Sequence, residues 1–76
     1  MFLHTDLARA RHEVIDALGL PEECEGGVML RGSVDELDWY ARELMRLPFT
    51  FEVRGPAALR TTIARLAGEL LDRCRA

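Results

Sequence analysis

The chain has 76 residues, an apolar content of 49% and a formal net charge of −3. These totals predict a single globular domain over residues 1–76, small enough that association with another chain often adds stability. They argue against a disordered chain, and no apolar run approaches the roughly 18 residues of a membrane span.

The charges are divided unevenly along the chain. Residues 1–38 carry nine acidic and three basic side chains, whereas residues 39–76 carry four acidic and seven basic ones. A duplex-DNA binder usually has a basic excess that neutralises phosphates, so this domain is not expected to grip duplex DNA alone. A dipolar surface of this kind could instead pair with a copy of itself.

The first predicted elements are a short strand and a helix. Residues 2–5 are apolar enough for a strand, and Thr5 or Asp6 can cap the helix that follows, because its side-chain oxygen accepts a free backbone N–H. Gly19 suits the left-handed position after a helix, and Pro21 prevents continuation. The apolar stripe of this helix is Leu7, Val14, Ile15 and Leu18.

A hairpin and a second helix are predicted next. Gly26-Gly27 favours a tight turn between an acidic edge strand at residues 22–25 and a second strand at residues 28–32. Ser33 and Glu36 have the spacing of a capping box, in which each side chain accepts a backbone N–H of the other. Pro48 ends the helix, whose apolar face is Leu37, Tyr40, Ala41 and Leu44.

The last predicted elements are a strand and a long helix. Residues 49–54 alternate, with Phe49, Phe51 and Val53 on one side. Pro56 suits the first helical position, where its missing N–H is not needed. The helical stripe that follows runs nearly to the end of the chain through Leu59, Ile63, Leu66, Leu70 and Cys74.

The element order β-α-β-β-α-β-α predicts an α+β fold. Its first six elements match the ferredoxin-like pattern, an antiparallel sheet with two helices on one face, and an additional C-terminal helix follows. We expect this last helix either to cover the other face of the sheet or to reach onto a partner. That other face is predicted to carry Met29, Arg31, Thr50, Glu52 and Arg54.

The chain resembles the C-terminal extension (WCX) domain of bacterial WYL-domain transcriptional regulators. The resemblance rests on the order and spacing of five stretches: FLHTDLARARHEV at the start, VDELDW from Val34, LMRLP from Leu44, FEV from Phe51 and PAALR from Pro56. It covers almost the whole chain.

The resemblance implies a non-enzymatic domain that, in the family, follows a WYL domain and a helix-turn-helix domain. Such extensions contribute to dimerisation and to the surface on which an effector acts. This chain holds neither of those domains, so we expect an excised domain, a truncated product or a small protein that acts in trans. The expected partners are a second copy and those two domains, in cis or in trans.

Three arginines are the candidate ligand-binding residues. Arg31, Arg54 and Arg60 could form a patch for an anionic or single-stranded nucleic-acid effector, aided by the helix start at Pro56. The ordinary alternative is that they are solvated or paired with Glu52 and its neighbours. A free-standing domain that binds a small anion is therefore the second functional hypothesis.

Trp39 is the candidate interface residue. Trp39 and Tyr40 are adjacent and so lie about 100° apart on a helix, which means that they cannot both face the core. Because Tyr40 belongs to the apolar stripe, Trp39 is expected at an interface or at the edge of the core.

No pattern of residues specifies catalysis, a metal or a cofactor. His4, His12, Cys24 and Cys74 have no metal-site spacing, and the separated cysteines indicate a reduced protein, for which the cytoplasm is the expected compartment. Acylphosphatases share this fold class, but they need an asparagine beside their arginine, and the chain has none. Phe49 and Phe51 alternate in phase with Val53 and are expected in the core rather than as a base-stacking platform.

Overall fold

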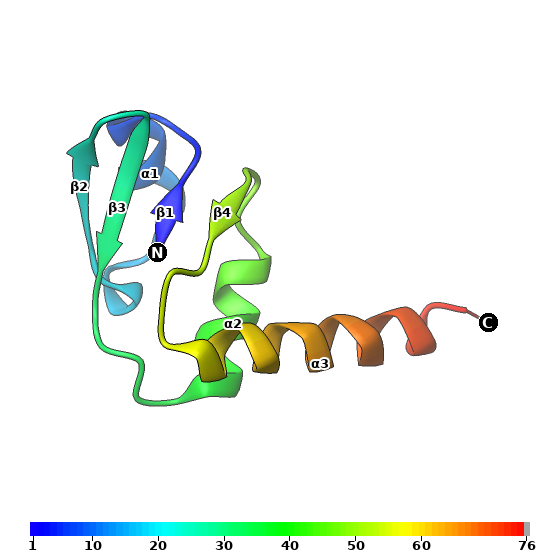
Figure 1. Cartoon of the computed structure of the whole chain (residues 1–76). Coiled ribbons are helices and arrows are strands. Elements are labelled where there is room, and N and C mark those ends of the chain that lie inside the picture. Colours follow the sequence, from blue (N-terminus) through cyan, green and yellow to red (C-terminus); the bar gives the residue numbers. More distant parts are fainter. Residues whose placement is uncertain (76) are drawn as a thin grey trace.

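The computed structural model describes residues 1–75. Within them the chain forms a four-stranded antiparallel sheet, three α-helices and one short 3₁₀ helix, as Figure 1 shows. In chain order the elements are β1 (Phe2–Leu3), α1 (Leu7–Glu13), η1 (Asp16–Leu18), β2 (Leu20–Cys24), β3 (Gly27–Arg31), α2 (Leu37–Met45), β4 (Phe51–Glu52) and α3 (Ala57–Arg73).

The strands lie in the order β2-β3-β1-β4, and all three neighbouring pairs are antiparallel. Helix α1 connects β1 to β2, and β3 lies between these two strands. Helix α2 connects β3 to β4, and β1 lies between those two. Phe2 pairs with Met29 on one side and with Glu52 on the other. The two helical connections thus each pass over one strand, and the predicted α+β class is confirmed.

The core lies between one face of the sheet and two helices. Successive strand residues point to opposite faces, so Leu3 and its register partner Val28 share the core face. Helices α1 and α2 cover this face together. The buried side chains that they contribute are Ala10, Tyr40, Ala41 and Leu44.

The hairpin turn lies one residue earlier than predicted. Cys24 pairs with Gly27, so Glu25 and Gly26 form the turn, and Gly26 has a φ of +83°. Gly27 belongs to β3, where a Cβ would lie 2.4 Å from the Leu3 carbonyl oxygen. The second glycine is therefore required by the close approach of β1 and not by the turn.

The first helix ends earlier than predicted. Helix α1 stops at Glu13 because Val14 has an extended conformation, with φ −93° and ψ 123°. The chain then forms the separate turn η1, which lets Leu18 reach the core while Ile15 stays 46% exposed. The prediction that Ile15 lies on the apolar stripe of this helix was wrong, since the extended link after α1 rotates its side chain away from the stripe.

The predicted capping box does not form. Helix α2 begins at Leu37, its N-cap residue is Glu36, and no side chain caps it. Ser33 lies in an irregular, exposed segment before the helix. The half-buried Val34 packs against the core, and this contact places the chain before α2 so that the helix starts four residues after Ser33.

The strand predicted over residues 49–54 is shorter, but its alternation is confirmed. Only Phe51 and Glu52 form β4, yet Phe49, Phe51 and Val53 are all half-buried and pack against the core. The intervening side chains, Thr50, Glu52 and Arg54, are exposed.

Helix α3 packs on α2 and then extends away from the body of the domain (Figure 1). Its first half follows the predicted stripe, with Leu59 fully buried and Leu66 4% exposed. Leu70 is 48% exposed and Cys74 is exposed, so the predicted burial of this stripe holds only as far as Leu66. Because α2 ends at Met45, nothing in the described chain covers the end of α3.

Candidate effector and assembly surfaces

The face of the sheet opposite the core is open and carries both charged and apolar side chains. Met29 and Arg31 lie on it, as predicted, because their neighbours Val28 and Leu30 point into the core. By the same alternation Leu20, Glu22 and Phe2 share this face. Leu20 is 71% exposed. The open face is thus a mixed surface rather than a purely basic one.

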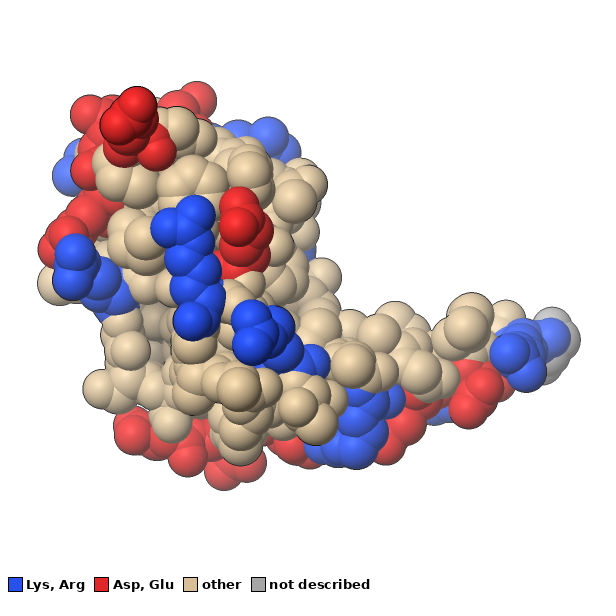
Figure 2. Space-filling view, in the orientation of Figure 1, with Lys and Arg blue, Asp and Glu red and all other residues tan. Residues whose placement is uncertain are grey.

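The three predicted ligand arginines each have a local contact. The Arg31 guanidinium donates to the Glu22 carboxylate at 2.8 Å. Arg54 lies 3.8 Å from Glu52, and Arg60 donates to the Val53 carbonyl at 3.2 Å. Figure 2 shows the basic side chains of this face in separate groups, with an acidic group among them. The carboxylates offset much of the positive charge that an anion would meet.

Phe2 is a feature of the open face that the sequence reasoning missed. Phe2 is only 7% exposed although its side chain points away from the core. The Arg54 guanidinium lies 4.6 Å from the centroid of its ring, and the His4 ring lies edge-on to it at 5.0 Å. Both side chains lie against the ring, and because Arg54 is 56% exposed its contact with Phe2 is a surface cation–π interaction. The sequence signal for this burial was the position of Phe2 beside Leu3 in a predicted strand.

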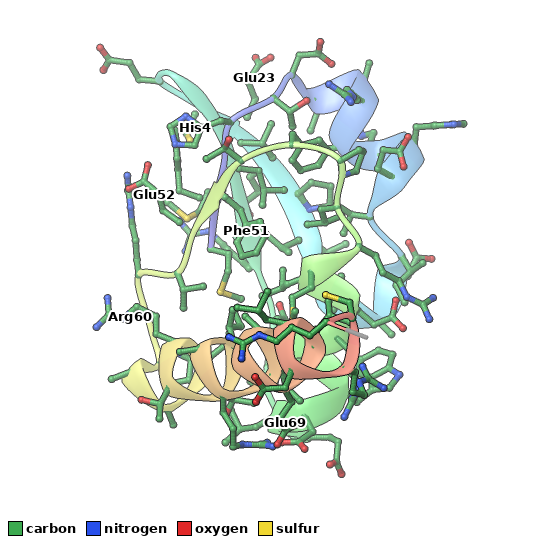
Figure 3. The ribbon with its side chains drawn as sticks, turned by 90° about the vertical axis from the view of Figure 1, so that its right-hand side faces the viewer. His4, Glu23, Phe51, Glu52, Arg60 and Glu69 are labelled. Carbon is green, nitrogen blue, oxygen red and sulfur yellow. The ribbon has the colours of Figure 1, made fainter. Side chains whose placement is uncertain are left out.

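His4 and Glu52 form a contact at the edge of the same face. Figure 3 shows the two side chains pointing toward each other, His4 from the residue that follows β1 and Glu52 from β4. A nitrogen of the His4 ring lies 2.7 Å from a carboxylate oxygen of Glu52. The two side chains are 45% and 48% exposed, so their attraction is screened by water.

Tyr40 fixes the position of helix α2. It is 1% exposed, and its hydroxyl donates to the Leu18 carbonyl of η1 at 2.5 Å. Burial raises the pKa of the Tyr40 phenol above its ordinary value of 10.0. The neutral hydroxyl therefore links the second helix to the start of the hairpin.

Trp39, which directly precedes Tyr40 on α2, is 40% exposed. This exposure agrees with its predicted place outside the centre of the core. Helical geometry places Arg42, three residues further along the chain, beside it, and Arg46 follows on the same side about one turn later, at the end of α2. A partly exposed tryptophan next to arginines is a composition that is enriched at protein interfaces.

Helices α2 and α3 are joined across their exposed side by Arg65. Its guanidinium donates to Asp38 of α2 at 2.8 Å and to Glu69 of α3 at 3.0 Å. Hydrogen bonds to Asp38 and then to Glu69 raise the pKa of Arg65. Because the group is solvated, these bonds orient α3 rather than stabilise the domain strongly.

Beyond this bridge, two hollows flank the contact between α2 and α3. One has a volume of about 280 Å³ and is lined by Arg42, Met45, Arg46, Leu66, Leu70 and Arg73. The other, of about 350 Å³, is lined by Arg42, Leu66, Glu69, Asp72 and Arg73.

A third hollow, wide and shallow, lies between the end of β1 and the hairpin. It has a volume of about 720 Å³, and its lining includes His4, Asp6, Glu23 and Cys24. Among the described residues, no three histidine, cysteine, aspartate or glutamate side chains are placed so that they could hold a metal ion. The same residues include no helix long and apolar enough to cross a bilayer.

In the comparison with protein families, the WCX domain matches residues 4–71. Neither the curated proteins nor the solved structures contain a match to this chain. The family match covers more than half of the chain and confirms the resemblance seen in the sequence. The chain belongs to the WCX domain family.

Proposed function

We propose that this domain is a non-enzymatic assembly and effector-response module of a WYL-type bacterial transcriptional regulator, and that it forms a homodimer. Membership of the WCX family supports the link, because that family is associated with WYL-type regulators. The WYL and helix-turn-helix domains would then act with it, in cis or in trans.

We also assign the fold to the ferredoxin-like class. The strand order β2-β3-β1-β4 supports this assignment, since two β-α-β units interlock when each helical connection passes over one strand. Helix α3 is then an addition to the common unit.

The observation that carries the assembly proposal is the uncovered end of α3. Leu70 and Leu71 are 48% and 55% exposed on a segment that extends away from the domain. Leu70 and Leu71 are consecutive on this helix, and the apolar area that they expose is available for a contact with another chain. The half-exposed Trp39 on the neighbouring helix adds an aromatic anchor of the kind that dominates interface energetics.

The solution mass of the domain across a dilution series tests this proposal, with light scattering after size exclusion as the readout. We expect a dimer that dissociates on dilution. Trp39→Ala is expected to weaken this association while the circular dichroism spectrum stays unchanged. A monomer at every concentration would contradict assembly by this domain.

The alternative function is the binding of a small anion or short nucleic acid on the open face of the sheet. It is favoured by Arg54, whose guanidinium lies over the Phe2 ring, and weakened by Glu52 and Glu22 beside the arginines. Binding to the folded state alone would raise the melting temperature in the presence of pyrophosphate or a short oligonucleotide. No shift with either probe would argue against this function.

A further inference from the structure

The C-terminal part of α3 is poorly covered within the domain: residues 67–75 are all exposed, and only side chains at the end of α2 approach them. Helix α3 has 17 residues and α2 has 9, so at about 1.5 Å per residue α3 is roughly 12 Å longer. The radius of gyration is 12.7 Å, whereas a compact chain of this length has about 11 Å. Helices in proteins are stabilised mainly by packing of their apolar face, so residues 67–75, here called the arm, need a cover.

The hollow of about 280 Å³ lies where the arm leaves α2. We call this hollow the notch. Met45, Leu66 and Leu70 supply its apolar part, and Arg42, Arg46 and Arg73 supply three guanidinium groups. No carboxylate of residues 1–75 lies within 4.0 Å of the Arg42 or Arg73 guanidinium, and Arg46 reaches only Glu43, at 3.8 Å. The notch therefore suits an apolar side chain that is accompanied by a negative charge.

The arm itself carries such a combination. Leu71 is 55% exposed, and Asp72 follows it directly, with Glu69 two residues before it. The Asp72 carboxylate is 74% exposed, and its described ion pair, to Arg75, is 3.9 Å long. Figure 3 shows Glu69 pointing away from the sheet, on the outer side of α3. The arm thus carries an uncovered leucine, Leu71, next to a carboxylate, Asp72, whose described ion pair is long.

We propose that the arm of a second copy docks into the notch, with Leu71 of that copy against Met45 and Leu70, and its Asp72 facing Arg42 and Arg73. The inference rests on the proposed homodimer and specifies its interface. Because each copy carries both the notch and the arm, two antiparallel arms satisfy each other around a two-fold axis, and the assembly closes at two chains. The arginines and carboxylates set the antiparallel orientation, and the leucines supply the buried apolar area.

The apolar part of this interface is tested with Leu71→Ser, measured by the concentration dependence of the solution mass. A dimer loses two buried leucine side chains, so the dissociation constant is expected to rise by at least about tenfold. Leu20→Ser is the matched control, because Leu20 is 71% exposed but lies on the sheet. Unchanged circular dichroism in both variants keeps folding separate from association.

The charged part is tested by reversal and rescue. Arg42→Glu and Asp72→Arg are each expected to weaken the dimer, and the double variant is expected to restore it, because it exchanges the two charges across the interface. The docking arrangement would be overturned if Leu71→Ser left the dissociation constant unchanged, or if the double variant were weakened by the sum of the two single effects. Neither result would contradict the proposed dimer itself. A monomeric parent at every concentration would overturn both proposals.

Discussion

Replacing Tyr40 by phenylalanine tests how helix α2 is held against the rest of the domain. The substitution keeps the buried ring and removes only the hydroxyl, which donates to the Leu18 carbonyl. Since Tyr40 is 1% exposed, water cannot easily replace that donor. The Leu18 carbonyl is then left in the interior without its partner.

The expected loss follows from this geometry. A neutral hydrogen bond contributes about 0.5–1.5 kcal/mol, and a buried acceptor left without a partner costs about 1–3 kcal/mol. We therefore expect Tyr40→Phe to lower the free energy of unfolding by about 1–2 kcal/mol. For a domain of this size such a loss lowers the melting temperature by roughly 5–15 °C.

Urea unfolding followed by Trp39 fluorescence measures this loss. The control is Thr61→Val, which removes an exposed hydroxyl that donates to the Ala57 carbonyl at 3.4 Å and should change stability by less than about 0.5 kcal/mol. If Tyr40→Phe were no more destabilising than Thr61→Val, the assignment of a stabilising role to this hydrogen bond would be refuted.

The same variant has a pH signature. The folded-state pKa of Tyr40 is raised above 10.0 by burial. Its contribution is therefore complete below pH 10.0 and is lost as the pH rises through the folded-state pKa, because the unfolded chain releases the proton first. The stability difference between the parent and Tyr40→Phe should shrink with rising alkaline pH, and a constant difference would contradict the burial of an ionisable hydroxyl.

Two further substitution pairs test the packing. Gly27→Ala should destabilise the domain by about 1–3 kcal/mol, because the added Cβ would meet β1. Gly68→Ala, whose Cβ would have nothing within 4 Å, should stabilise it by about 0.5–1 kcal/mol. Equal effects of the two substitutions in urea unfolding would contradict the close approach of β1 to Gly27. Leu59→Ala should cost about 2–5 kcal/mol, whereas Leu71→Ala in the dilute monomer should change stability by less than about 0.5 kcal/mol. Similar losses at both leucines in thermal melts would show that the arm packs on its own domain.

Predictions that depended on local periodicity succeeded where the element packs along its whole length. Phe49, Phe51 and Val53 alternate into the core because the pleat of an extended chain points every second side chain to one face. Tyr40 and its stripe neighbours face the sheet for the same kind of reason, with the helical period in place of the strand period.

Local signals failed where a tertiary contact opposed them. Val14 and Ile15 continue the helical stripe in the sequence, yet helix α1 ends before them and the extended link lets Leu18 reach the core. Ser33 had the spacing of a cap, but packing of Val34 against the core shifts the start of α2.

The candidate surfaces were predictable in part. The alternation of strand residues placed Arg31 and Arg54 on the open face, and helical geometry placed Trp39 outside the core. Sequence could not reveal that Phe2 lies under Arg54, because that contact joins β1 to the segment after β4 across the sheet.

The sequence alone determined the family of this chain, its α+β class and the direction in which most side chains point, because these depend on local periods and spacings. Only the tertiary structure decided what covers each apolar face. The apolar stripe of α3 continues in the sequence from Leu59 to Leu70, but α2 ends at Met45, so Leu59 and Leu66 are buried and Leu70 is exposed.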